Sequence, residues 1–434
     1  MHQLVTPSRH HPGELLILGE TTYRRTQHRF GLLPEDRLRH LWLVGKTGSG
    51  KSTLLANLVA QDLAAGRGLA LLDPHGDLVE SVLPLVPRSR TNDVLVFDPE
   101  DRDWPVSFNP FRRGRQPHAD PALLASQLIS VFKKHWGDSW GPRLEHILRN
   151  AILAIADHPK ATILFLYRFL TDEPLRLRVV ETIRDPVVRA FWVKEFAGYG
   201  KSLQAEALAA VQNKLGGFVS HPTVRNIVSQ ERSRVDFIDL MNSRGIMLAS
   251  LASGRIGEDA SHLLGGLLLT SIQLAAMERP RGNAPLYVYV DEFQSFVTES
   301  IATMLSEARK FGLGLTLSHQ YLAQLPLSIR DAVLGNVGST MLFRLGGDDA
   351  NRLADDFMPF SAADLQMLNR YHVAVKLLAR GETLRPFSAQ TLAAPAAPAD
   401  PGEIAARIRA ASRRRFAMSR SDLETAVARS LGEP

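Results

Sequence analysis

The stretch Leu41–Thr53, LWLVGKTGSGKST, constrains the fold of this 434-residue chain more than any other. Its apolar start, Leu41–Val44, predicts a short buried strand, and Thr53–Leu63 predicts a helix. Between them, every position of the phosphate-loop pattern G-x-x-x-x-G-K-[ST] is filled, in the strand–loop–helix context that the pattern requires. A glycine-rich turn that binds nothing is the alternative, and the flanking strand and helix argue against it. The stretch therefore predicts a polyphosphate site between a strand and a helix.

Each residue type in this loop has a physical reason to be there. Glycines let successive backbone N–H groups turn inward around a polyphosphate, and the following helix directs its positive end at the same anion. Lys51 is expected to reach the β- and γ-phosphates, and the Ser52 hydroxyl to ligate Mg²⁺. The expected nucleotide-binding residues of the loop are Gly45, Lys46, Thr47, Gly48, Ser49, Gly50, Lys51, Ser52 and Thr53.

Asp73 ends a second predicted strand, Gly68–Asp73, and is followed by Pro-His-Gly-Asp. A strand that ends in this way places a carboxylate at the carboxyl edge of the sheet, where open α/β sheets bind ligands. Asp73 is therefore a candidate cofactor-binding residue. It is as well suited to cap the predicted helix Leu78–Leu83, and both roles stay open.

The composition of the chain restricts which metal sites and partners it can have and where in the cell it acts. The chain has no cysteine, which excludes disulfides and thiolate metal sites and fits a reducing cytoplasm. Its formal net charge of +6 suits a polyanionic partner without requiring one. The N-terminal residues lack the pattern of a signal peptide. The longest uncharged run, His262–Met277, is shorter than the ~20 apolar residues of a membrane helix. We expect a cytoplasmic protein with no membrane segment of its own.

Apolar patterning divides the chain into an α/β part and a helical part. Predicted strands and helices alternate over residues 40–120 and 243–390, which predicts a mostly parallel sheet with helices on both faces. The strand rhythm disappears over residues 121–242, where helical spacing predicts an inserted all-helical domain. Within residues 1–39, Leu15–Leu18 is expected to form a short strand, and the rest is expected to form an arm that wraps the core. Residues 391–434 are expected to form a Pro/Ala linker and a basic tail, mobile rather than bound to nucleic acid or a partner.

A second half of the predicted site follows the strand Leu286–Val290 (LYVYV). Asp291 at its end can hold Mg²⁺ through water, and Glu292 is placed to polarise an attacking water as a general base. An apolar run followed by Asp-Glu is a weak signal alone, but it gains weight beside a phosphate loop. Gln320 closes a later strand, Leu313–Ser318, and can sense the γ-phosphate or orient the water; a simple loop residue is the alternative.

Phosphoryl transfer also develops charge that an arginine, often from a neighbouring subunit, stabilises. The candidates are Arg309, Arg255 and Arg344. Sequence spacing does not choose among them, and a surface ion pair is the alternative role of each.

Taken in order, these motifs resemble a known family. GKTGSGKST, DPHGD, the Asn109-Pro110-Phe111 element, the helical insertion, YVDEF and TLSHQ occur in the order typical of the HerA–FtsK superfamily. They are most similar to its conjugative coupling-protein branch, the TraG/TraD-like ATPases of type IV secretion. The resemblance covers roughly Leu32 to Gln390.

The resemblance implies a RecA-like P-loop ATPase core that binds ATP and Mg²⁺ and acts as a ring, usually a hexamer, that pumps DNA. It assigns Gln320 as the γ-phosphate sensor and Arg309 as the arginine that acts in trans. The helical insertion would engage DNA or the relaxosome, and its Lys133, Trp136 and Trp140 combine charge with aromatic faces. Coupling proteins usually begin with membrane-spanning helices, which this sequence lacks. A peripheral position at the inner membrane through a secretion-channel partner is therefore expected.

Several functions remain open at this point. The first is a DNA translocase related to conjugative coupling ATPases. The second is a soluble HerA-type motor partnered with a nuclease, and the third is an ATPase that moves protein without binding DNA. A nucleotide-binding scaffold that does not hydrolyse is disfavoured, because a pure binder has no need of Glu292 beside the metal-binding acid.

Overall fold

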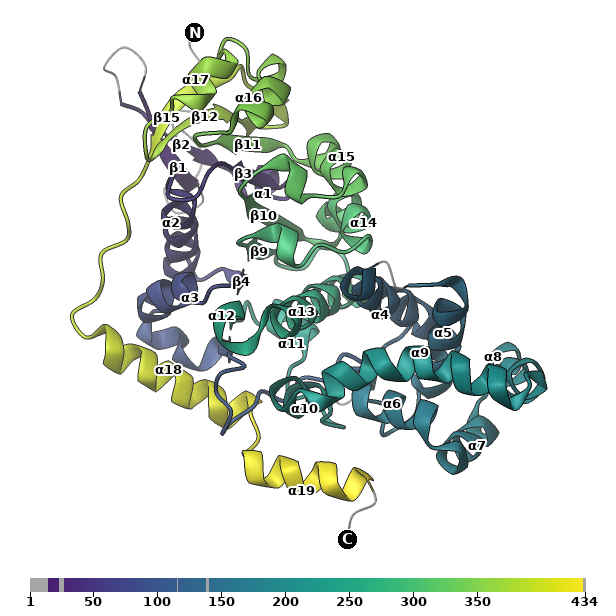
Figure 1. The fold of residues 1–434 in the computed structure, drawn as a ribbon. Coiled ribbons are helices and arrows are strands. Elements are labelled where there is room, and N and C mark those ends of the chain that lie inside the picture. The colour runs from purple at the N-terminus through teal and green to yellow at the C-terminus, as the bar shows by residue number, and fades with distance from the viewer. Residues whose placement is uncertain (1–14, 23–26, 115, 138–139, 432–434) are drawn as a thin grey trace. The chain divides into compact units, whose positions relative to one another are not determined.

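The computed structural model describes residues 15–22, 27–114, 116–137 and 140–431 (Figure 1). The chain divides into two compact units. The sheet unit comprises Met1–Val96, Asp239–Ser250 and Arg279–Ala411, and the helical unit comprises Phe97–Ile238, Leu251–Glu278 and Ser412–Pro434. Each unit is described by itself below.

The sheet unit is built on an eleven-stranded sheet within the described residues, with strand order β2-β1-β15-β12-β11-β3-β10-β9-β4-β8-β5. The pairings from β11 through β8 are parallel, and those that join β11, β12, β15, β1 and β2 are antiparallel. The strands are β1 (Leu16–Thr21), β2 (Arg29–Leu32), β3 (Leu41–Val44), β4 (Gly68–Asp73), β5 (Val94–Phe97), β8 (Ile246–Ser250), β9 (Leu286–Val290), β10 (Leu313–His319), β11 (Ser339–Leu342), β12 (His372–Lys376) and β15 (Phe387–Thr391).

The central strands are apolar because they are covered on both faces. Every residue of β3, β4, β8, β9 and β10 is buried, which is typical of a parallel sheet with helices on each side. The predicted α/β class with a mostly parallel sheet is confirmed. The helices of this unit are α1 (Pro34–Arg37), α2 (Lys51–Ala64), α3 (Asp77–Val82), α11 (Phe237–Asn242, shared with the helical unit), α14 (Ser300–Glu307), α15 (Leu327–Asn336), α16 (Gly347–Leu353), α17 (Ala362–Gln366) and α18 (Pro401–Phe416, also shared).

The N-terminal region contains the expected strand as β1 (Leu16–Thr21), but more of it belongs to the sheet than the expected arm implies. Residues 1–14 of that arm lie outside the described residues, but β1 and β2 are strands of the sheet. β1 pairs antiparallel with β15, so Gly19 lies opposite Thr391. Leu16 and Leu18 are buried in the core of the sheet unit, which explains why this segment is ordered against the sheet rather than wrapped around it.

The C-terminal region differs from the expected mobile tail. After the linker, residues 401–416 form helix α18 (Pro401–Phe416), and α19 (Arg420–Leu431) follows. Ala405 and Ile408 of α18 join the hydrophobic core of the sheet unit, and Ile408 is fully buried. The linker is also anchored, because Asn57 Nδ2 donates to the carbonyl oxygens of Leu392 and Ala393 at 3.3 and 2.6 Å. A few apolar residues among the arginines are enough to dock this helix.

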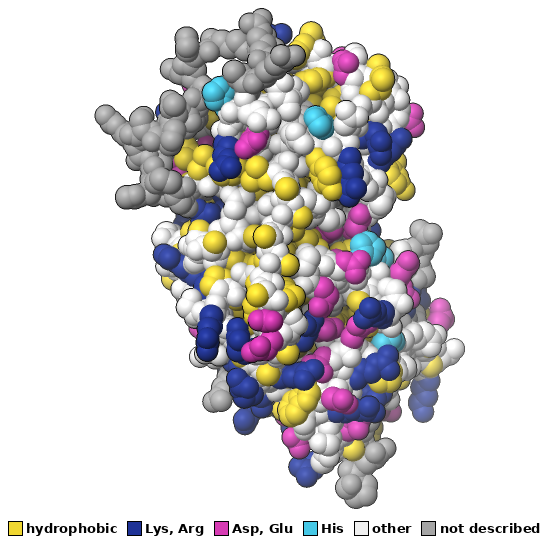
Figure 2. Space-filling view, turned by 90° about the vertical axis from the view of Figure 1, so that its left-hand side faces the viewer, with side chains coloured by type: hydrophobic (Ala, Val, Ile, Leu, Met, Phe, Trp, Pro, Cys, Tyr) yellow, Lys and Arg dark blue, Asp and Glu magenta, His cyan; other side chains and the backbone are white. Residues whose placement is uncertain are grey.

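Arginine side chains of α18 pair with acidic side chains elsewhere in the chain. Arg409 pairs with Glu80 within the sheet unit. Within the helical unit, the Nε of Arg413 donates to Asp101 Oδ2 at 2.6 Å. Figure 2 shows Lys and Arg side chains interspersed with Asp and Glu over the lower part of the displayed face.

Many helices of the helical unit start with a proline or a capping side chain. Proline occupies the first turn of α4, α5, α7, α8 and α10, where its missing N–H costs nothing. Asp120, Thr162 and Asp172 accept backbone N–H bonds at the starts of α4, α6 and α7. The helices are α4 (Pro121–Trp136), α5 (Pro142–Ile155), α6 (Ile163–Thr171), α7 (Glu173–Thr182), α8 (Pro186–Ala190), α9 (Lys201–Ser220), α10 (Pro222–Val228), α12 (Ser253–Ile256), α13 (Glu258–Glu278) and α19.

Helix α13 belongs to the helical unit, although its sequence position lies within the predicted ATPase segment 243–390. It packs against α4, and its apolar residues face inward on nearly all sides. Among the described residues, α13 alone is long and apolar enough to cross a membrane, but 89% of that apolar window is buried within the protein. Such burial is typical of a core helix.

Candidate nucleotide site

The phosphate loop joins β3 to α2 and needs glycine at particular positions. Gly48 and Gly50 have φ angles of 75° and 118°, in the region that side chains disfavour. A Cβ atom on Gly45 would lie 2.6 Å from the Cβ of Phe343, so only glycine fits there. A Cβ on Gly48 would meet nothing within 4 Å, which leaves open space above the loop.

Lys51 and Ser52 begin helix α2 and occupy the positions that the motif predicts. Lys51 is 6% exposed, and its Nζ donates to the carbonyl oxygens of Gly45 and Lys46 at 2.6 and 3.3 Å. Burial lowers the pKa of Lys51, and the charges of Glu292 and Asp291 oppose that shift. Ser52 is exposed, and its hydroxyl donates to Asp291 Oδ2 at 3.4 Å.

The register of the sheet brings Asp291 to this loop. In β10, Leu317 lies opposite Val290 of β9, and His319 lies opposite Val44 of β3. The carboxyl ends of the three strands therefore meet at one edge. Asp291 is 5% exposed and its N–H donates to Leu72 O at 3.0 Å. Burial raises the pKa of its carboxyl group, the Ser318 hydroxyl opposes the rise, and nearby Glu292 and Asp73 add to it.

Glu292 is held in a strained and oriented position. Its φ angle of 43° is in the left-handed region, which is unfavourable for a residue with a Cβ and is found at functional sites. Its Oε1 accepts from Gln320 Nε2 at 2.9 Å, and its Oε2 accepts from Gln294 Nε2 at 2.7 Å. Gln320 is therefore joined to Glu292, and both carboxylate oxygens have fixed partners.

Asp73 lies in the same region but is engaged with the backbone. Its Oδ2 accepts from the N–H groups of Leu78 and Val79 at 2.8 and 3.0 Å, and its Oδ1 accepts from His75 N at 2.9 Å. These bonds are those of the capping role that the sequence left open. A direct contact of Asp73 with nucleotide remains a prediction.

The three candidate arginines lie in different places. Arg309 is exposed in the short helix that precedes β10, at the opposite end of that strand from Gln320. Seven residues of strand separate the two ends by roughly 20 Å, so Arg309 does not reach the site of its own chain. Arg255 pairs with Glu100 at 2.8 Å in the helical unit. Arg344 is exposed next to the loop, and its carbonyl oxygen accepts from Lys46 N at 2.9 Å.

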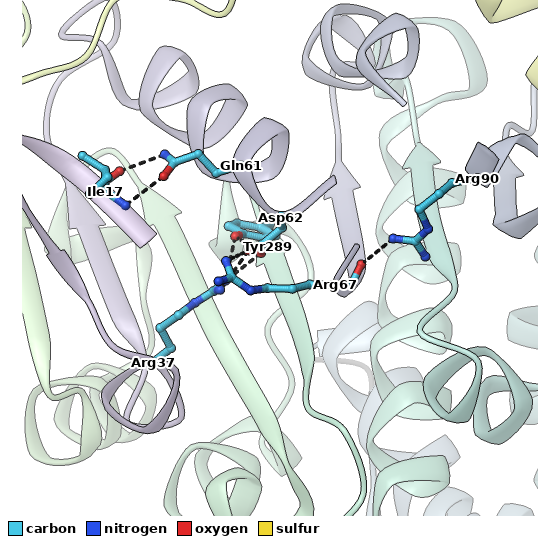
Figure 3. A network of polar contacts seen from close by, with 7 residues as sticks. All are labelled: Ile17, Arg37, Gln61, Asp62, Arg67, Arg90 and Tyr289. Carbon is cyan, nitrogen blue, oxygen red and sulfur yellow. Dashed lines mark hydrogen bonds and ion pairs between the residues drawn. The ribbon is translucent and has the colours of Figure 1, made fainter. Parts of the chain in front are cut away.

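A buried polar network stabilises the framework of the site (Figure 3). Asp62 of α2 is fully buried and accepts from Arg37 Nη1 and Nη2 of α1 at 2.8 and 2.6 Å. The hydroxyl of Tyr289 donates to Asp62 Oδ2 at 2.6 Å and accepts from Arg37 Nη2 at 2.9 Å. Arg67 Nη1 donates to Asp62 Oδ1 at 3.0 Å. The network thus connects α2, the helix after the phosphate loop, to Tyr289 of β9, which lies two residues before Asp291.

The residues present fit Mg²⁺ bound together with a nucleotide. Within the described part of the chain, no group of three or more His, Cys, Asp or Glu side chains is suited to hold a metal ion. Mg²⁺ is instead commonly bound by one or two carboxylates together with phosphates and water. Ser52 and Asp291 provide adjacent oxygen ligands of this kind.

Two contacting residues were not predicted. Gln294 orients Glu292, and Ser318 lies beside Asp291. The available signal for Ser318 was its position near the carboxyl end of β10, two residues before Gln320. Gln294 lies in a short helix after a strained residue, and its sequence gave no signal of its direction.

Comparison with known proteins places this geometry in context. A family model described as the type IV secretion-system coupling protein DNA-binding domain matches residues 30–346. The type 4 coupling protein DotL of Legionella pneumophila is 22% identical over 360 residues, which cover 68% of this chain and 46% of the relative. The chain thus spans less than half the length of that relative.

Solved structures share the fold at low identity. The plasmid coupling protein TrwB, in complex with a non-hydrolysable ATP analogue, is 16% identical with a TM-score of 0.65, covering 88% of this chain and 90% of that chain. VirB4 of Thermoanaerobacter pseudethanolicus is 16% identical with a TM-score of 0.58, covering 89% and 99%. The predicted combination of a RecA-like core and a helical domain is confirmed.

Proposed function

The chain belongs to the family of type IV secretion-system coupling proteins, as its motifs predicted, and from this premise we propose that it hydrolyses ATP with Mg²⁺ to move DNA through a ring of subunits. The observation that carries the proposal is the meeting of two distant motifs. Ser52 lies 3.4 Å from Asp291, and Glu292 follows directly with its carboxylate held by Gln320.

Each residue has a role in this proposal. Lys51 and the N–H groups of the phosphate loop bind the phosphates, and Ser52 and Asp291 hold the metal. The bound Mg²⁺ would neutralise charge on the transferred phosphoryl group. Glu292 accepts the proton of the attacking water, and the amides of Gln320 and Gln294 keep its carboxylate oriented.

A ring is supported by the position of Arg309. This side chain is exposed and lies at the far end of β10 from its own site, so it can stabilise developing charge only at a site of a neighbouring subunit. A hexamer is the expected oligomer of this family. Arg344 is the alternative, because it is exposed beside the loop.

Binding of DNA is supported by the family and by the basic excess of the chain. The tryptophans expected to contact DNA stack on other aromatic rings of the same unit. Trp136 stacks with Phe132 and Trp140 at 4.9 and 5.5 Å between ring centroids, and Lys214 lies 5.4 Å from its ring. Contact with DNA in the helical unit is therefore assigned to the basic side chains around this stack rather than to exposed ring faces.

ATP hydrolysis measured with and without single- and double-stranded DNA tests the proposal. Stimulation by DNA that weakens steeply with salt is expected, because phosphate contacts release counterions. Hydrolysis that DNA does not change would favour an ATPase that moves protein. Association with a nuclease would favour a HerA-type motor. The proposed location is the cytoplasm, peripheral to the inner membrane through a secretion-channel or relaxosome partner.

A further inference from the structure

One turn of the sheet unit lies directly against the phosphate loop, although no motif marks it. The backbone N–H of Tyr371 donates to Ser49 O at 2.9 Å. The Tyr371 ring packs on Gly50, where an added Cβ would lie only 2.6 Å from the Cδ1 atom of the ring. Gly50 is therefore required for the approach of this ring as well as for its own φ angle of 118°. The turn and the loop form one packed surface.

Tyr371 is held in an unfavourable backbone conformation. Its φ angle of 68° is in the left-handed region that favours glycine. The conformation is fixed from both sides, because its N–H bonds to Ser49 and its carbonyl oxygen accepts from Thr391 N at 2.9 Å. Glycine would adopt the same turn without strain, so the turn alone does not explain a tyrosine. Strain of this kind is typical of functional sites.

The order of the strands shows which end of a nucleotide this turn would face. Asp291 and Gln320 follow β9 and β10, on one side of β3. Tyr371 precedes β12, which lies beyond β11 on the other side of β3. A triphosphate bound along the loop has its γ end at the carboxylates, so its nucleoside end leaves toward β12 and Tyr371.

The chemistry of the turn suits a nucleoside. Tyr371 is half-buried, and the exposed Arg370 places its guanidinium 4.7 Å from the ring centroid of Tyr371. Arg370 forms no ion pair within the part of the chain that the structure describes. An aromatic ring with an adjacent guanidinium is a surface on which bases of any sequence stack. We propose that Tyr371 and Arg370 form the nucleoside subsite of the nucleotide site. This subsite rests on the nucleotide binding of the proposed function.

The test compares a nucleotide with an inorganic polyphosphate that lacks a nucleoside. Affinities of ADP and of inorganic tripolyphosphate are measured by calorimetry with Mg²⁺ and without DNA. Tyr371→Gly, which removes the ring and relieves the strain, should weaken ADP about tenfold and leave tripolyphosphate unchanged. Tyr371→Phe keeps the ring and should bind both ligands as the wild type does. Arg370→Ala alters an exposed side chain outside the backbone contacts, and should weaken ADP alone by a smaller factor.

Unchanged ADP affinity in both Tyr371→Gly and Arg370→Ala would overturn the subsite. Equal weakening of both ligands would also overturn it, because Tyr371 would then only support the loop. Since neither DNA nor turnover enters the assay, failure of the proposed translocation would leave this result standing.

Discussion

Replacing Asp62 by Asn should destabilise the sheet unit strongly. Asp62 is fully buried and accepts hydrogen bonds from Arg37, Arg67 and Tyr289. The side chain of Arg37 is only 4% exposed. An arginine side chain is not deprotonated in proteins, so the buried guanidinium of Arg37 keeps its charge when Asp62 is neutralised. Removing one member of a buried pair costs about 3–5 kcal/mol. This is a large part of the roughly 5–15 kcal/mol that stabilises a typical domain.

The loss of unfolding free energy is measured by urea unfolding. Amide hydrogen exchange in peptides from α2 and β9, the elements that the network joins, follows the unfolding locally. Glu307→Gln is the matched control, because the Lys310–Glu307 pair is 60% and 39% exposed. That variant should change the free energy of unfolding by less than about 0.5 kcal/mol. An Asp62→Asn protein that loses less than about 1 kcal/mol would show that the buried pair is not needed, and would refute the reasoning.

Three further predictions concern the site, the pH dependence of stability and the ring. Lys51→Ala should lose nucleotide binding or turnover, whereas Glu292→Gln should keep ATP bound and lose about 10²–10⁴-fold in turnover; full activity in Glu292→Gln would remove it as the base. His40 is buried, with its pKa lowered from 6.5 to about 4 by burial, partly opposed by its bond to Leu305 O. Because the unfolded chain binds the proton more readily, stability is present above pH 6.5 and falls by roughly 3 kcal/mol as pH drops through 4. His40→Asn should flatten this acid limb in unfolding curves, and an unchanged limb would contradict the assignment. Finally, Arg309→Ala subunits mixed with wild type should suppress ATPase activity more than in proportion, while additive activities would exclude action in trans.

The strands that carry the site could be predicted almost to the residue. Leu41–Val44 and Leu286–Val290 are continuous apolar runs bounded by glycine or acid, and the structure has strands with those limits. Local patterns of this kind depend on the chain's own composition. The edge of the sheet could not be predicted, because β1 pairs with β15, which lies more than 350 residues away. The short apolar pattern of β1 does not indicate which strand it pairs with.

Parts of the site depended on backbone geometry that composition does not reveal. Asp73 was suited equally to a ligand or to a cap, and only the positions of the N–H groups of Leu78 and Val79 show the cap. Tyr371 reaches the loop through a left-handed turn that no local pattern predicts. The basic C-terminal segment resembled a mobile tail by charge, but burial of Ile408 docks it.

The shared metal site of Ser52 and Asp291 is the central claim, and a double-mutant cycle on Mg²⁺-dependent nucleotide affinity tests it most directly. Calorimetry would compare wild type, Ser52→Ala, Asp291→Asn and the double variant, each with and without Mg²⁺. If both side chains hold one ion, each single variant loses most of the increase in nucleotide affinity that Mg²⁺ causes. The double variant then loses little more. Fully additive losses, or a gain retained in the double variant, would show that the two motifs do not form one site.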